Sequence, residues 1–281
     1  MRVIPCKAII EAVKRLCIEA AWKLPDDVLA AMQKALETEE SPRGKVILNQ
    51  CIENAKIAAC GNDPVCQDTG VAVYFVECGS EVTISGGTLT DAVNEGTRQG
   101  YRDGYLRKSI VADPLFDRKN TGDNTPAVVH VDLVRGDGLK ITLLPKGGGS
   151  ENCSALRMLT PADGPSAVAD FVVDTVVESG GKPCPPVIVG VGIGGTADMA
   201  MLCAKKALLR PVGKSHADKR YAELERQIMD RINASGIGPQ GLGGRMTALA
   251  VHIEEYPSHL ASLPVAVNLN CHAARKAEIR L

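Results

Sequence analysis

The chain has 281 residues, of which 45% are hydrophobic, and it carries a formal net charge of −1. This length provides a substantial core, in one large domain or two small ones. The near-neutral charge and the aromatic content of 3% argue against a nucleic-acid partner, which needs basic surfaces and stacking platforms. No apolar run reaches the roughly 18 residues of a membrane span.

Hydrophobic periodicity and turn residues predict helices and strands that mix without a strict βαβ order. In chain order, we predict helices at 6–21 and 42–61, a strand at 71–76, a helix at 89–100, strands at 127–134 and 139–144, a helix at 165–178, a strand at 187–191, a helix ending at 209, a helix at 221–232, and strands at 247–253 and 265–269. The Gly-rich segment 135–138 predicts a hairpin between the two strands that it joins. We therefore expect a mixed α/β fold: a single domain over residues 1–281, with one mixed β-sheet flanked by helices and a helical N-terminal part.

The ten cysteines do not indicate disulfides, because the chain is large and residues 1–25 mix charges with apolar residues instead of forming a secretory signal. No Cys/His group has the spacing of a zinc site. We therefore expect a reduced, cytoplasmic protein in which most of the cysteines are structural thiols.

Three cysteines stand apart because they lie in short polar stretches that border strand-like runs: Cys66, Cys184 and Cys271. Three thiolates can hold an iron–sulfur cluster and leave one iron open to act as a Lewis acid. The three are far apart in sequence, and a small thiol buried in the core is the common alternative. If the strand before Cys271 runs antiparallel to the strands after Cys66 and Cys184, all three thiols reach the same sheet edge.

Two glycine-rich segments each have a functional and a plain structural interpretation. Gly190 to Gly195 fits G-x-G-x-x-G after a strand, with Asp218 further on, which is the context of a dinucleotide fingerprint; a tight strand-to-helix turn is the alternative. Lys146 precedes the glycines 147–149, so the order of a phosphate-binding Walker loop fails. That loop is either flexible or a run of backbone N–H donors for a carboxylate.

Three further polar residues are candidates by their chemistry. Asp68 directly follows the Cys66-Gln67 pair and needs a cation nearby, unless its side chain caps its own turn. The fork of Arg107 suits a dicarboxylate, although an exposed Arg is more often solvated. The imidazole of His259 suits acid–base work, although it is equally an ordinary, partly buried histidine.

Taken together, several blocks in the same order resemble the class I, iron–sulfur-dependent fumarate hydratases and their L(+)-tartrate dehydratase relatives, over nearly the whole chain. The blocks are Cys66–Gly70, Leu106–Ser109, Asn120–Pro126, Lys146–Asn152, Cys184–Pro186 with the following Gly-Gly-Thr, and Pro264–Asn268 leading to Cys271.

The resemblance implies a [4Fe–4S] cluster bound by Cys66, Cys184 and Cys271, with an open iron that holds the substrate. It also implies a substrate pocket lined by Gln67, Asp68, Arg107, the Gly148 backbone and His259, in which Asp68 and His259 are the catalytic groups. The implied reaction is the reversible hydration of fumarate to (S)-malate. Dehydration of L(+)-tartrate to oxaloacetate is the alternative.

Single-chain members of this family carry a second domain, so the resemblance implies that this chain is the α subunit of the two-subunit form. A separate β subunit, in an α2β2-type assembly, is expected to complete the site. The chain alone is then expected to bind the cluster and to show little activity. Two other classes stay open: a dinucleotide-dependent oxidoreductase, and a non-enzymatic iron–sulfur or scaffold subunit.

Overall fold

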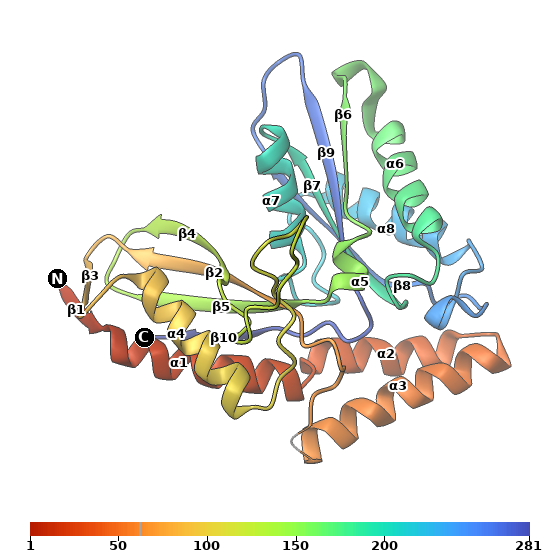
Figure 1. Cartoon of the computed structure of the whole chain (residues 1–281). Coiled ribbons are helices and arrows are strands. Elements are labelled where there is room, and N and C mark those ends of the chain that lie inside the picture. The colour runs from red at the N-terminus through yellow and green to blue at the C-terminus, as the bar shows by residue number, and fades with distance from the viewer. Residues whose placement is uncertain (62) are drawn as a thin grey trace. The chain divides into compact units, whose positions relative to one another are not determined.

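The computed structural model of the chain describes residues 1–61 and 63–281 (Figure 1). The chain forms two compact units, one built from residues 1–25, 55–148 and 275–281, the other from residues 26–54 and 149–274. The predicted mixed α/β fold with a helical N-terminal part is confirmed, but the strands form three sheets where the sequence predicted one. None of the described helices is long and apolar enough to cross a membrane.

The first unit is built around a four-stranded sheet in the order β10-β5-β2-β4. β4 runs parallel to β2, while β5 runs antiparallel to β2, and β1 and β3 form a small parallel pair of their own. The elements are β1 (Arg2–Pro5), α1 (Cys6–Trp22), β2 (Val71–Gly79), β3 (Val82–Ser85), α4 (Leu89–Asp103), β4 (Val128–Val134), β5 (Leu139–Lys146) and β10 (Ala277–Arg280).

Close packing between α1 and α4 explains two glycines inside a helix. A Cβ atom at Gly96 would lie 2.6 Å from Cβ of Val13, and one at Gly100 would lie 2.6 Å from Cβ of Cys17. Glycine is a poor helix former, but here it lets the two helices approach each other. The hydrophobic core of this unit also takes in Tyr74 of β2.

The predicted hairpin between β4 and β5 is wrong, although both strands exist. β2 lies between them, so that Phe75 faces His130 on one side and Thr142 on the other. β2 is buried over most of its length, whereas most of β4 is exposed. The apolar strand therefore takes the central position, and the Gly-rich segment 135–138 joins two strands that do not pair with each other.

The second unit is built around a four-stranded sheet in the order β6-β9-β7-β8. β7 runs parallel to β8 and antiparallel to β9, and α7 covers one face while α6 and α8 cover the other (Figure 1). The elements are α2 (Asp26–Thr38), β6 (Ala155–Leu159), α6 (Gly164–Ser179), β7 (Val187–Gly194), α7 (Ala197–Ala207), α8 (Lys219–Asn233), β8 (Ala248–Tyr256) and β9 (Leu263–Asn270), with short 3-10 turns at Pro161–Asp163 and Pro239–Gly241. Two helices contain residues of both units, α3 (Pro42–Gly61) and the single turn α5 (Gly148–Glu151).

The first two glycines of the G-x-G-x-x-G segment lie inside β7, and Gly195 follows directly, so the segment does not form a phosphate-binding turn. A Cβ atom at Gly190 would lie 2.1 Å from the carbonyl oxygen of Ala204, and one at Gly192 would lie 1.9 Å from that of Ala200. Because side chains alternate along a strand, both glycines face α7 while Val189 and Val191 face α6 and α8. These glycines set a close helix–strand contact, so the dinucleotide interpretation loses its structural basis.

A buried carboxylate fixes the turn between α2 and α3 to the loop before β8. Glu39, only 1% exposed, accepts hydrogen bonds from the backbone N–H groups of Glu40, Ser41, Arg245 and Met246. Burial raises the pKa of Glu39, but these N–H groups outweigh burial, led by Arg245 and Met246, and they hold the pKa below its ordinary value.

We expect the substitution Glu39→Gln to lower the free energy of unfolding by about 1–3 kcal/mol near neutral pH, because an amide NH2 would face N–H donors and leave them unsatisfied. The folded-state pKa of Glu39 is depressed below its ordinary value of 4.5. Its contribution to the free energy of unfolding is therefore complete above about pH 4.5 and is lost as the pH falls through the folded-state pKa. The difference in the free energy of unfolding between the unmodified protein and the variant, measured in urea, should therefore narrow at acid pH. A gap that stayed constant from about pH 7 to about pH 3 would contradict this linkage.

Candidate active site

The Cys66 segment lies just before β2 in the first unit. Cys66 is half-buried, and its thiol donates to Oε1 of Gln67 at a sulfur–oxygen distance of 3.4 Å. Tyr101 anchors this segment, because its hydroxyl donates to the carbonyl oxygens of Thr69 and Gly70 at 3.0 and 2.9 Å. Burial raises the pKa of Tyr101 well above its usual range, so the hydroxyl stays protonated and keeps donating.

Asp68 caps its own turn and also binds the loop of glycines 147–149. Its Oδ1 accepts from the N–H of Gly70 at 3.0 Å, and its Oδ2 accepts from the N–H of Gly148 at 2.8 Å. The turn-capping interpretation of Asp68 is thus confirmed. The N–H of Gly148 is therefore occupied, and it is available to another acceptor only when Asp68 releases it.

Arg107 is tied to the same place through its backbone. Its carbonyl oxygen accepts from the hydroxyl of Thr69 at 3.0 Å, and its side chain is exposed. The buried Asn124 joins them by donating to the carbonyl oxygen of Gly70 at 3.2 Å. The first unit therefore brings together five of the predicted site residues, Cys66, Gln67, Asp68, Arg107 and Gly148.

Arg275 completes this group and was missed by the sequence interpretation. Its guanidinium, with the residue only 1% exposed, donates from Nη2 to the carbonyl oxygen of Asp68 at 2.7 Å. A cation beside Asp68 was the condition that sequence reasoning set for an acidic residue next to a thiolate. No local pattern identifies Arg275, because its contact with Asp68 spans 207 residues of sequence.

Cys184 and Cys271 lie together in the second unit. Cys184 precedes β7 and Cys271 follows β9, and these strands are antiparallel, with Ile188 opposite Asn270. The N–H of His272 donates to the carbonyl oxygen of Cys184 at 3.1 Å. The prediction that these two cysteines reach the same sheet edge is confirmed.

The backbone at Cys184 is unusual, with φ at 55° in the left-handed region that non-glycine residues rarely occupy. Gln240 supports this conformation by donating to the carbonyl oxygen of Pro185 at 2.8 Å and by contacting Nδ1 of His272 at 3.0 Å. Strain of this kind persists only when surrounding contacts impose it, and it is frequent at functional sites.

Cys51 is a third thiol near this pair that sequence reasoning classed as structural. Burial, and after it the charges of Cys271 and Cys184, together raise the pKa of Cys51 to about 11. The three sulfurs therefore lie within electrostatic range of one another. The helix that carries Cys51, α3, gives no sequence signal for this proximity.

The prediction that Cys66 shares a sheet edge with the other two is wrong. Cys66 precedes β2, which belongs to the sheet of the first unit, whereas Cys184 and Cys271 flank strands of the second. Pairing of β2 with β4 and β5 is decided by long-range packing, which the local pattern around Cys66 does not reveal.

The chemistry of the three cysteines fits thiolate ligands of an iron–sulfur cluster. None is in a disulfide, and Cys184 is exposed while Cys66 and Cys271 are half-buried, in contrast to the buried Cys17 and Cys203. Soft thiolates are the usual ligands of such clusters. Among residues 1–61 and 63–281, no three His, Cys, Asp or Glu side chains are arranged to hold a single metal ion.

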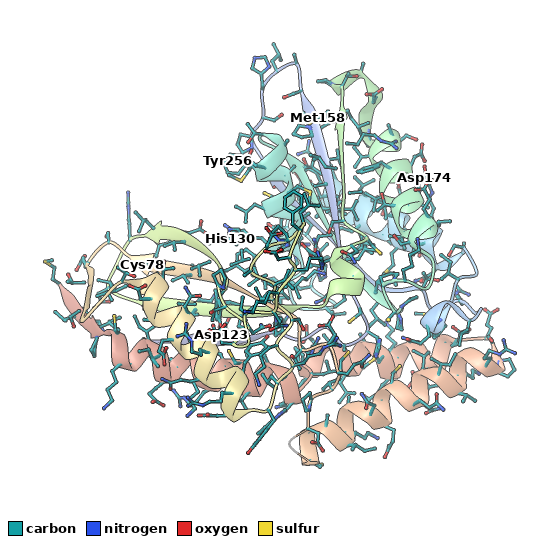
Figure 2. The ribbon with its side chains drawn as sticks, viewed as in Figure 1. Cys78, Asp123, His130, Met158, Asp174 and Tyr256 are labelled. Carbon is teal, nitrogen blue, oxygen red and sulfur yellow. The ribbon has the colours of Figure 1, made fainter. Side chains whose placement is uncertain are left out.

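His259 lies at the other end of the second sheet from Cys271. It is exposed in the loop before β9, where the N–H of Ala261 donates to its Nδ1 at 3.1 Å. The eight residues of β9 separate the two, which at strand geometry is roughly 25 Å. Figure 2 labels Met158 and Tyr256, which mark the His259 end of this sheet. A four-carbon diacid beside Cys271 does not reach His259 within this unit.

Comparison with known proteins gives the family. The sequence pattern described as fumarate hydratase (Fumerase) matches residues 10–280. A protein of Methanocaldococcus jannaschii named putative L(+)-tartrate dehydratase subunit alpha is 43% identical over 278 residues, which cover 97% of each chain. The L(+)-tartrate dehydratase subunit alpha of Escherichia coli is 34% identical over 278 residues, covering 96% of this chain and 90% of that protein. The chain belongs to the fumarate hydratase family and is a hydro-lyase.

Proposed function

We propose that this hydro-lyase is an α subunit that acts on a four-carbon hydroxy diacid, with L(+)-tartrate as the favoured substrate and the malate–fumarate pair as the alternative. The observation that carries the proposal is the family match over residues 10–280. Both relatives are named as the alpha subunit of an L(+)-tartrate dehydratase, and these names favour tartrate as the substrate.

We propose that Cys66, Cys184 and Cys271 hold a [4Fe–4S] cluster and that the whole of residues 1–281 acts as one catalytic domain. When bound, the cluster supplies a Lewis acid that eases departure of the substrate hydroxyl. The accessible Cys184 and its imposed left-handed backbone support this role. Location in the reducing cytoplasm fits ten cysteines of which none is in a disulfide.

The chain's own residues position the substrate in this proposal. Arg107 offers a planar fork that pairs with a carboxylate through two parallel hydrogen bonds. Once the hydrogen bond between Gly148 and Asp68 is broken, the N–H of Gly148 is a further donor for the substrate. The freed carboxylate oxygen of Asp68 can then accept or hold a proton. Gln67 lies beside the Cys66 sulfur and orients what binds there. A role for His259 requires that its loop comes from another chain of the assembly.

A separate β subunit, in an α2β2-type assembly, is the partner that we propose. The test is to prepare the chain anaerobically with and without a candidate β subunit, to load iron and sulfide, and to measure kcat/KM for L(+)-tartrate, malate and fumarate. We expect turnover only in the complex, with tartrate preferred at least about tenfold. A preference for malate would select the alternative, and a loaded complex that hydrates or dehydrates none of them would contradict the proposal.

A pair of matched variants separates substrate binding from general damage. Arg107→Lys keeps the charge and removes the fork, so we expect a higher KM for the diacid. Arg102→Lys is the control, because Arg102 is an exposed residue of α4 paired with Asp103. A non-enzymatic scaffold predicts that neither variant changes any binding of diacid to the complex.

A further inference from the structure

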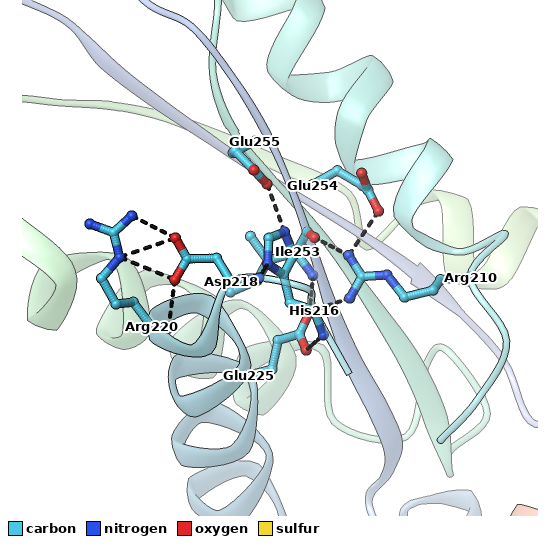
Figure 3. A network of polar contacts seen from close by, with 8 residues as sticks. All are labelled: Arg210, His216, Asp218, Arg220, Glu225, Ile253, Glu254 and Glu255. Carbon is cyan, nitrogen blue, oxygen red and sulfur yellow. Dashed lines mark hydrogen bonds and ion pairs between the residues drawn. The ribbon is translucent and has the colours of Figure 1, made fainter. Parts of the chain in front are cut away.

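The edge of the second sheet carries a site that the proposed reaction does not use. β8 is the outer strand, with β7 on one side only. Figure 3 shows how its edge is closed at Ile253: the N–H donates to the carboxylate of Glu225 at 2.8 Å, and the carbonyl oxygen accepts from the guanidinium of Arg210. An unprotected edge strand normally needs such covering.

The start of the strand is closed in the same way. The side chain of Asn233 accepts from the N–H groups of Thr247 and Ala248 at 2.9 and 2.8 Å, and donates to the carbonyl oxygen of Ala248 at 3.1 Å. Three polar side chains thus cover the outer edge of β8, Asn233 at its start and Glu225 with Arg210 at Ile253. The stretch between them is centred on Val251.

Strand geometry leaves the backbone groups of Val251 facing outward. The N–H and C=O groups of successive strand residues point to opposite sides, so Val251 faces the same way as Ile253, away from β7. Val251 is only 4% exposed, and no described residue supplies it with a hydrogen bond on that side. A buried backbone donor and acceptor without partners points to a ligand or to water.

These groups open into a cavity of about 450 Å³, within the size range of small-molecule sites. Its apolar lining includes Ala222 and Met229 of α8 and Leu249 of β8. Its charged lining is basic in balance, because Glu225 is paired with Arg210 and Glu223 is paired with Arg226.

Lys214 and Lys219 supply the excess positive charge. Both line the cavity, and among the described residues neither has an acidic partner. An ammonium group of this kind binds a phosphate as a point charge.

We propose that this cavity binds a nucleoside phosphate. The heterocycle edge of a nucleobase offers one acceptor and one donor side by side, which complement the N–H and C=O of Val251. Met229 and Leu249 contact the ring, and Lys214 and Lys219 hold the phosphate. An added strand of a partner protein fits less well, because the covered positions at Ala248 and Ile253 leave backbone groups for a single residue.

The test uses the full chain and titrates it with AMP, adenosine and inorganic phosphate by isothermal calorimetry. We expect AMP to bind at least about tenfold more tightly than either fragment, since base and phosphate bind at opposite ends of one cavity. Lys214→Ala with Lys219→Ala should weaken AMP at least about tenfold and leave adenosine unchanged. The matched control is Arg220→Ala, which removes a nearby exposed cation that pairs with Asp218 and does not line the cavity.

A backbone readout tests the other end of the site. In labelled protein, AMP and adenosine should shift the amide resonance of Val251, while phosphate should not. Val251→Pro removes the outward N–H without breaking a hydrogen bond to β7, but it also alters a side chain that packs in the core; it should abolish adenosine binding. If that variant does not fold, the shift of the Val251 amide resonance in the unmodified protein is the deciding measurement. Absence of AMP binding at millimolar concentration, or equal binding of AMP and phosphate, would overturn the proposal, as would full binding in the double lysine variant.

Discussion

Serine in place of Cys66, Cys184 or Cys271 is expected to abolish stable binding of the proposed iron–sulfur cluster, because each change removes one of the three proposed thiolate ligands. The matched controls are Cys17→Ala and Cys203→Ala. Burial raises the pKa of Cys17 to about 12, and burial also raises the pKa of Cys203, so both stay protonated thiols and are poor ligands. Iron, acid-labile sulfide and visible absorbance after anaerobic reconstitution measure the outcome.

The proposed ligand assignment predicts cluster loss in the three serine variants and cluster retention in the two alanine variants. If all five variants lost the cluster equally, the loss would reflect damage to the fold and the assignment would be wrong. If only the serine variants of the second unit lost it, Cys66 would not be a ligand. Circular dichroism of each variant shows whether the fold is retained, so that cluster loss is read only from folded protein.

Arg210→Met is expected to lower the free energy of unfolding by about 3–5 kcal/mol, because it leaves the carboxylate of Glu225 buried without its cation. The side chains of Arg210 and Glu225 are only 10% and 7% exposed. Burial alone would lower the pKa of Arg210, but hydrogen bonds to Glu254 and Glu225 raise it, so the guanidinium stays charged. Urea unfolding measures the loss.

Two further variants test the cause of that loss. Arg220→Met removes an arginine whose side chain is 85% exposed and should have no measurable effect. Arg210→Met combined with Glu225→Leu should recover much of the lost stability, because no unpaired charge then stays buried. A double variant as unstable as the single one would show that packing, and not charge, is what Arg210 contributes.

Local periodicity predicted the elements better than it predicted their partners. The helix predicted at 6–21 is α1, Cys6–Trp22, because an amphipathic pattern fixes a helix without reference to the rest of the chain. The strands around 127–144 were found, yet their predicted hairpin is wrong, since β2 separates them. The short α2 at Asp26–Thr38 was not predicted at all.

The candidate site divides in the same way. The block of Cys66, Asp68 and Gly148 was predicted from sequence, and in the structure Cys66 contacts Gln67 while Gly148 donates to Asp68. Arg275 and Cys51 were not, because each is brought to the site by contacts far along the chain. The Gly190 segment was misleading, since close packing on α7 and phosphate binding both select glycine.

The two units are interleaved along the chain, which constrains how the protein is made. The first unit takes residues from three separate segments, and β10 pairs with β5 across more than a hundred residues of the second. During synthesis, the first sheet therefore cannot be completed until residues 277–280 have left the ribosome. The edge of the first sheet that β10 later covers therefore stays unpaired while the second unit is translated. Unpaired strand edges are prone to aggregation, so we expect a chaperone to bind the chain at this stage. Neither unit can be cut out as one continuous fragment for separate expression.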